Sequence, residues 1–140
     1  VDLSLNHDGD WEKAKKITAS VGPSARGYCG EYPESERESA ALSRFLLRIP
    51  FDFVFIFSRG EQDGLSCTYR ENFVKNSAKS GKIISKYFGI PIFTDDRLKF
   101  STLRSWIMGG LGIPCAELIL SDRMMTNIRE IFSVCGVVAS

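Results

Sequence analysis

The segment FDFVFIF at residues 51–57 constrains the fold most, because it is almost continuously apolar and aromatic. Pro50 precedes it, and the polar, glycine-containing stretch at 58–64 follows it. A short apolar run with such bounds predicts a central strand that is buried on both faces of a sheet. Loops that follow such strands often carry the binding or catalytic groups of α/β proteins.

Before this strand, the sequence predicts a helix that begins near Ser35 and ends at Pro50. The Ser35 hydroxyl is placed to cap it, and Glu36 and Glu38 fall in its first turn, where negative charge suits the helix dipole. Apolar residues at helical spacing mark its inward face. The expected inward residues are Ala41, Leu42, Phe45, Leu46 and Ile49.

After the strand, helical patterns alternate with short apolar runs. The expected elements are a helix at 71–88, a strand at 89–93, a helix capped by Ser101, a strand at 112–120 and a last helix with an apolar stripe from Met124 to Cys135. The long helix should turn Phe73, Ile84, Tyr87 and Phe88 inward. This alternation predicts an α/β fold with a mostly parallel or mixed sheet covered by helices.

The composition predicts one globular domain over residues 1–140, because 44% of the chain is hydrophobic and 25% is charged. A net charge of +1 implies no broad attraction to nucleic acid or to an anionic membrane. No apolar run approaches the roughly 20 residues needed to span a bilayer. The first residues lack the pattern of a signal peptide, which favours a cytoplasmic location. Secretion stays an alternative because the chain begins at Val1.

The residues that most often bind metals or attack substrates are few and scattered. The four cysteines form no CxxC pair, which argues against a zinc ribbon or a thioredoxin-like site and favours buried free thiols over two disulfides. The single histidine, His7, has no second histidine to complete a usual catalytic zinc site. A nucleophilic triad is equally disfavoured, because it also needs a histidine base.

A cluster of charged residues follows the predicted central strand. Arg59, Glu61 and Asp63 lie in the loop after this strand, where α/β proteins often carry binding or catalytic groups. They favour either of two interpretations, a clamp for a charged ligand or a solvated loop with local ion pairs.

Several stretches together resemble one family. They are VDLSLNHDGDW at 1–11, YCGEYPESERESAALSRFL at 28–46, FDFVFIFSRGE at 51–61, YFGIP at 87–91 and LRSWIMGGLGIPCAELIL at 103–120. Their order and spacing are similar to those of M14-type zinc carboxypeptidases, especially the bacterial γ-D-glutamyl-diaminopimelate peptidase branch, which cuts cell-wall peptides. The resemblance implies a partial zinc-carboxypeptidase-like fold that matches only the C-terminal portion of such an enzyme. The strands with the family's first two zinc ligands would precede Val1.

The resemblance also implies that the zinc site is lost. The family's third zinc ligand, a histidine, aligns with Phe57, which has no lone pair for a metal. The general-base glutamate aligns with Ile119, and Glu117, two residues earlier on the same strand face, is the weak candidate to replace it. We therefore expect no metal ligands here and no cofactor, although zinc is expected in the family.

The residues implied to hold the substrate are partly lost as well. Of the family's Asn-Arg-Asn motif only Asn6 matches, and a leucine at position 5 replaces the arginine, whose forked hydrogen bonds leucine cannot make. The remaining candidates for substrate binding are Asn6, Arg59, Glu61 and Arg104.

The sequence thus predicts a catalytically inactive carboxypeptidase-like domain with a binding or structural role. Its implied partner is a short peptide or a cell-wall stem peptide, and an uncovered sheet edge, where the absent strands would pair, would favour a homodimer. One alternative is the C-terminal portion of an active metallocarboxypeptidase, a hydrolase. Another is an enzyme of a different class that uses Glu117, Glu61 or Asp63 as acid and base.

Overall fold

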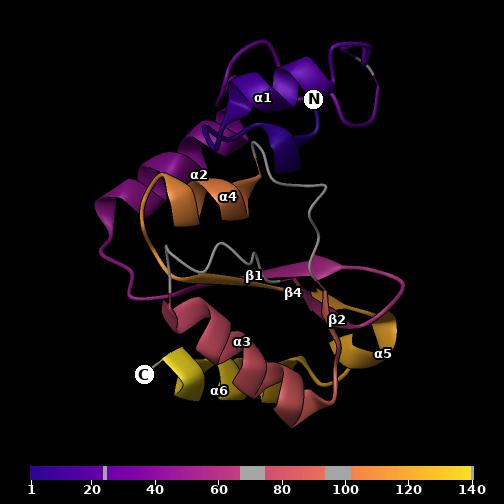
Figure 1. The fold of residues 1–140 in the computed structure, drawn as a ribbon, viewed down its shortest axis with the longest axis vertical. Coiled ribbons are helices and arrows are strands. Elements are labelled where there is room, and N and C mark those ends of the chain that lie inside the picture. The colour runs from indigo at the N-terminus through magenta and orange to yellow at the C-terminus, as the bar shows by residue number, and fades with distance from the viewer. Residues whose placement is uncertain (24, 67–74, 94–101, 140) are drawn as a thin grey trace. The chain divides into compact units, whose positions relative to one another are not determined.

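The structure is a computed structural model that describes residues 1–23, 25–66, 75–93 and 102–139. These residues fall into two compact units, whose elements are labelled in Figure 1. The N-terminal unit combines 1–51 with the chain from 97 to 112, and the sheet unit combines 52–96 with 113–140. One domain over 1–140 stays a prediction.

The sheet unit is built on four strands, β1 (Val54–Arg59), β2 (Gly64–Ser66), β3 (Ile92–Phe93) and β4 (Cys115–Leu120). Their order across the sheet is β1-β4-β2-β3. β4 pairs parallel with β1 and antiparallel with β2, and β2 pairs parallel with β3. The described residues therefore form a mixed sheet with helices, and the predicted α/β class is confirmed at that level.

One face of this sheet packs against α3 (Lys75–Phe88) and α6 (Ile128–Ala139), which lie together below the strands in Figure 1. Alternate residues of β4 point to that face, as the two-residue period of a strand requires. The core there consists of buried Ile84, Ile90, Ala116, Leu118, Leu120, Ile131 and Cys135. The predicted strand at 112–120 is thus confirmed as β4, which has a neighbour on each side.

The predicted central strand at 51–57 is wrong in its position. β1 begins at Val54, lies at the edge of the sheet and has β4 as its one neighbour among the described residues. Its side chains are only partly buried from Val54 to Ser58, and Arg59 is exposed. A continuous apolar run predicts a buried strand, but it does not say how many neighbouring strands the fold supplies.

Two further elements of the sheet unit differ from the expected ones. β2 was not predicted, because three residues that begin with glycine give no readable period. The last helix is interrupted, since α5 (Asp122–Met125) stops before α6 begins. Ser121 caps α5 by accepting a hydrogen bond from the N–H of Met124.

The inward faces of two helices also differ from prediction. In α2 (Arg37–Arg48) the buried residues are Ser39, Ser43 and Leu46, whereas Phe45 is 51% exposed. Ala41 and Ile49 are exposed too, and Leu42 is partly buried. In α3, Ile84 is buried as expected and Phe88 packs against the core, but Tyr87 is 60% exposed, and Phe73 lies outside the described residues. The buried face of α2 thus carries two small serines beside Leu46, so the large apolar residues marked the wrong face.

The N-terminal unit contains a short 3-10 helix, η1 (Leu3–Leu5), followed by α1 (Trp11–Ile17), α2 and α4 (Leu103–Gly109). Thr102 caps α4 through the N–H of Ser105, and the predicted cap, Ser101, lies outside the described residues. The buried apolar side chains are Trp11, Ala14, Cys29, Leu46, Trp106, Ile107 and Met108. Among the described residues of both units, no helix is long and apolar enough to cross a membrane.

Candidate functional site

The Asn6 side chain is fully buried and binds the loop segment at 29–36 in the N-terminal unit. Its Nδ2 atom lies 2.9 Å from the carbonyl oxygen of Cys29, 3.2 Å from that of Tyr32 and 3.0 Å from Ser35 Oγ. Its Oδ1 atom accepts a hydrogen bond of 3.2 Å from the N–H of Glu36. Protein groups therefore engage both ends of this amide, which accounts for Asn6 without a bound ligand.

The same contacts correct the predicted start of α2. Glu36 is the N-cap residue and makes no side-chain cap bond, and the Ser35 hydroxyl donates to Glu36 Oε1 at 3.1 Å. Gly30 lets the chain approach this point, since its φ is +93° and a Cβ would lie 2.5 Å from Asn6 Nδ2. A side chain at residue 30 would be strained and would collide with the bonded amide.

Two more of the conspicuous polar residues are buried in the N-terminal unit. His7 is 3% exposed, and its ring stacks on that of Trp106 with centroids 6.1 Å apart. Burial lowers the pKa of His7, and the negative charge of Glu34 opposes that shift. Arg104, predicted to bind substrate, is 5% exposed on α4. It is inside the unit rather than on its surface.

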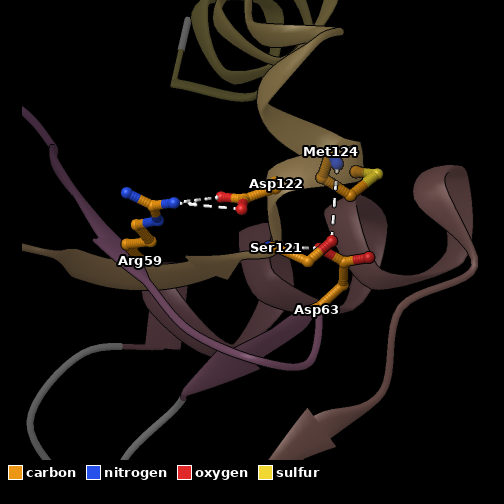
Figure 2. Close-up of polar contacts among 5 residues, drawn as sticks. All are labelled: Arg59, Asp63, Ser121, Asp122 and Met124. Carbon is orange, nitrogen blue, oxygen red and sulfur yellow. Dashed lines mark hydrogen bonds and ion pairs between the residues drawn. The ribbon is translucent and has the colours of Figure 1, made fainter.

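The charged cluster after β1 is engaged with the start of α5, as Figure 2 shows. Arg59 Nη2 lies 2.8 Å from one carboxylate oxygen of Asp122 and 3.0 Å from the other. Asp63 Oδ1 accepts a 2.7 Å hydrogen bond from the N–H of Ser121. Parallel β1 and β4 end at the same edge, which brings these residues together. Local contacts were one of the two interpretations of this cluster.

These contacts differ in their consequences for ligand binding. The Arg59 and Asp122 side chains are 77% and 76% exposed, so the ion pair is held only weakly. Glu61 is exposed as well. Ser121 and Asp122 were not among the predicted site residues, although they directly follow a predicted strand. Loops that follow parallel strands meet at the same edge of a sheet, and this rule could have predicted their contact with the charged cluster.

Glu117 lies on the face of the sheet opposite to Phe57. In the pairing of β1 with β4, Ile56 is opposite Glu117, Phe57 opposite Leu118 and Ser58 opposite Ile119. Side chains alternate between faces, so Glu117 shares its face with Ser58, whose hydroxyl donates a 2.5 Å hydrogen bond to Glu117 Oε1. The implied zinc-ligand position and the implied general-base position are therefore not brought together.

Phe57 packs against the apolar core, and its ring meets that of Phe132 edge-on with centroids 5.0 Å apart. An aromatic ring at this position offers no lone pair to a cation. Among the residues that the structure describes, no three His, Cys, Asp or Glu side chains form a group that could hold a metal ion. The residues at the implied position do not fit zinc.

The predicted site residues divide between the two units. Asn6 and Arg104 belong to the N-terminal unit, whereas Phe57, Arg59, Glu61 and Glu117 belong to the sheet unit. Within the sheet unit, Arg59 and Glu117 contact different partners.

The cysteines that the structure describes are all buried. Cys29 and Cys135 are free thiols, and burial raises the pKa of Cys135 to about 11, so that thiol stays protonated at neutral pH. Cys115 is buried beside β1, and Cys67 lies outside the described residues.

Comparison of the chain with family models, with curated proteins and with solved structures finds no match.

Proposed function

We propose that this chain is a catalytically inactive, M14-carboxypeptidase-like domain with a binding role. The observation that carries the proposal is Phe57. It occupies the position that the resemblance assigns to a zinc ligand, and its ring packs against the apolar core and contacts Phe132. Zinc catalysis requires three protein ligands and an open position, and a phenylalanine supplies neither a ligand nor space for water.

The surroundings of the acidic residues support the same proposal. A carboxylate-based enzyme pairs an acid with a base in one pocket. Here Glu117 accepts from Ser58 and Asp63 accepts from a backbone N–H, so each carboxylate has a structural partner. The other alternative, an active enzyme with a separately supplied front half, would still leave Phe57 at the third ligand position.

The proposed ligand is a short peptide, and the resemblance points to a cell-wall stem peptide. Such a ligand carries a carboxylate, for which the exposed Arg59 guanidinium is the proposed partner in the sheet unit. Asp122 holds Arg59 in an exposed ion pair, which a ligand carboxylate can displace at small cost. Arg104 is the second candidate cation, and its burial means that its segment must open before it can bind.

Zinc content and peptide binding test this proposal together. We expect purified protein, incubated with zinc and desalted, to retain far less than one zinc per chain by mass spectrometry of the metal. We expect a γ-D-glutamyl-diaminopimelate dipeptide to bind without hydrolysis in calorimetry and mass analysis. Stoichiometric zinc with hydrolysis would overturn the inactive assignment. Absence of any binding, with zinc also absent, would remove the peptide ligand.

We also propose that the chain self-associates through the uncovered sheet edge expected from the sequence. This second part of the proposal concerns assembly and does not depend on the ligand.

A further inference from the structure

Among the described strands β1 forms an edge of the sheet, and two backbone hydrogen bonds define which of its groups face outward. The N–H of Val54 donates to the carbonyl of Pro114, and the N–H of Gly60 donates to the carbonyl of Leu120. Backbone groups of successive residues point to opposite sides of a strand, so the even-numbered residues face β4. The N–H and C=O groups of residues 55, 57 and 59 point away from it.

The two edges of this sheet are built differently. β3, at the far edge, has two residues in the described part of the chain, and a short edge strand offers little to another chain. β1 has six residues, and neither proline nor lysine interrupts it. Its single charge, Arg59, sits at the strand end and is turned to Asp122. Among the described residues, the β1 edge therefore lacks the usual protections against pairing.

An apolar ledge, made of Phe55, Phe57 and Phe132, lies beside the outward backbone groups of β1. Phe55 and Phe57 are partly buried on the face that packs against α6. Phe132, on α6, is 53% exposed although its ring contacts Phe57. A further strand at this edge would lay its alternate side chains on this ledge and remove the three aromatic rings from water.

We propose that the strand which completes this edge is β1 of a second copy of the chain. In an antiparallel pair about a two-fold axis at Phe57, residue 57 of one copy lies opposite residue 57 of the other. Residue 55 then lies opposite residue 59. This register satisfies all the outward N–H and C=O groups of 55, 57 and 59 through about six hydrogen bonds.

The sequence of β1 suits a second copy because it complements itself. Phe57 meets Phe57 beside both Phe132 rings, and Phe55 meets the aliphatic stem of Arg59. The contact is isologous, so it closes after two copies, and the edges that remain in the described sheet are those of β3. This inference rests on the proposed self-association and not on lost catalysis, so a failed zinc assay leaves it standing.

The dimer is tested by sedimentation of the full chain over a range of concentrations, with a matched pair of variants. Arg59→Pro removes the outward N–H of residue 59, whereas Arg59→Ala removes the same side chain and keeps that donor. Two lost hydrogen bonds should raise the dimer dissociation constant about tenfold or more in Arg59→Pro relative to Arg59→Ala. Dimerisation that is equal in the two variants would overturn the register.

A second pair of variants tests the ledge. Phe132→Lys places a charge between the proposed copies, and Phe45→Lys alters a phenylalanine of the N-terminal unit that is 51% exposed. We expect dissociation of the first variant and an unchanged dimer for the second. The opposite ranking would assign the interface to α2 and overturn the proposal.

Amide hydrogen exchange tests the edge without any substitution, so misfolding of a variant cannot obscure the outcome. Amides of Ile56 and Ser58 should be protected at every concentration, because they bond to β4. Amides of Phe55, Phe57 and Arg59 should become protected only as the dimer forms. A monomer at all concentrations overturns the proposal, whether these amides exchange freely or are protected by other parts of the same chain.

Discussion

Each of the two compact units of this chain is stabilised internally by a different kind of interaction. Among the residues whose burial the structure describes, the buried polar side chains all belong to the N-terminal unit, namely Asn6, His7, Ser39, Ser43 and Arg104. The buried core of the sheet unit is entirely apolar in the described residues. Strands satisfy one another's backbone groups and leave their side chains to pack, whereas loops need side chains to satisfy the backbone.

This contrast sets what each unit should tolerate. In the sheet unit, stability depends on buried apolar area and on filled volume, so a shortened side chain is the damaging change. In the N-terminal unit, Asn6 replaces the backbone pairing that strands would supply, so a lost donor is the damaging change. The serine hydroxyls of Ser39 and Ser43 have no hydrogen-bond partner among the described residues, a further cost carried by this unit.

The largest expected effect is that of Leu118→Ala, because Leu118 is fully buried in the middle of β4. Truncation leaves a cavity, and we expect a loss of about 3–5 kcal/mol in the free energy of unfolding, measured in urea. Ile83→Ala, at a side chain that is 46% exposed on α3, should change stability by less than about 0.5 kcal/mol.

Hydrogen exchange of Leu118→Ala also shows how far the two units are independent. If each unit is a separate cooperative structure, protection should fall in 52–66 and 113–139 and persist around Asn6. Equal loss of protection in both units would instead support the single domain over 1–140 and weaken the contrast between the two units.

The next effect is that of Asn6→Ala, which removes the amide that binds Cys29, Ser35 and Glu36. Some of these groups are left buried without a partner, and the expected loss is about 2–3 kcal/mol in the free energy of unfolding. Trp11 Nε1 also donates to the Cys29 carbonyl, which limits the loss. Ser35→Ala, which removes one bond of the same set, should cost about 1 kcal/mol. A neutral Asn6→Ala would show that apolar contacts dominate in this unit too.

The sequence predicted the sheet unit better than the N-terminal unit, and the reason is physical. Burial of regular strands leaves a pattern, so the strand at 112–120 was found as β4. The edge position of β1 was not, because partners distant in the chain decide it. In the N-terminal unit, Asn6 is important through contacts with residues 29–36, and no local period reveals such contacts. Asn6 was assigned to a ligand because the resemblance implied that role.

The pH dependence of stability distinguishes the units further. Burial lowers the pKa of His7 below its ordinary value of about 6.5 in the folded chain. The unfolded chain therefore binds the proton first, so the stabilisation from neutral His7 is complete above pH 6.5 and is lost as the pH falls below it. We expect unfolding midpoints to drop between pH 6.5 and 5, and His7→Gln to remove that part of the slope.

Glu34 provides a control for this effect. Its negative charge raises the pKa of His7 and so opposes the effect of burial. Glu34→Gln should therefore lower the pKa of His7 further and enlarge the loss of stability in the same pH range. A shallower slope in Glu34→Gln would contradict the assigned cause.

Of the substitutions that break a polar contact, Arg59→Ala should affect stability least, because its ion pair with Asp122 is exposed on both sides. We expect a change of less than about 1 kcal/mol in the free energy of unfolding, and less still at high salt. The same variant should weaken dipeptide binding if Arg59 is the cation that meets the ligand carboxylate. Lost stability with unchanged binding would show that Arg59 serves α5 alone. Unchanged stability with lost binding would show that the strand ends of the sheet unit, and not its core, bind the ligand.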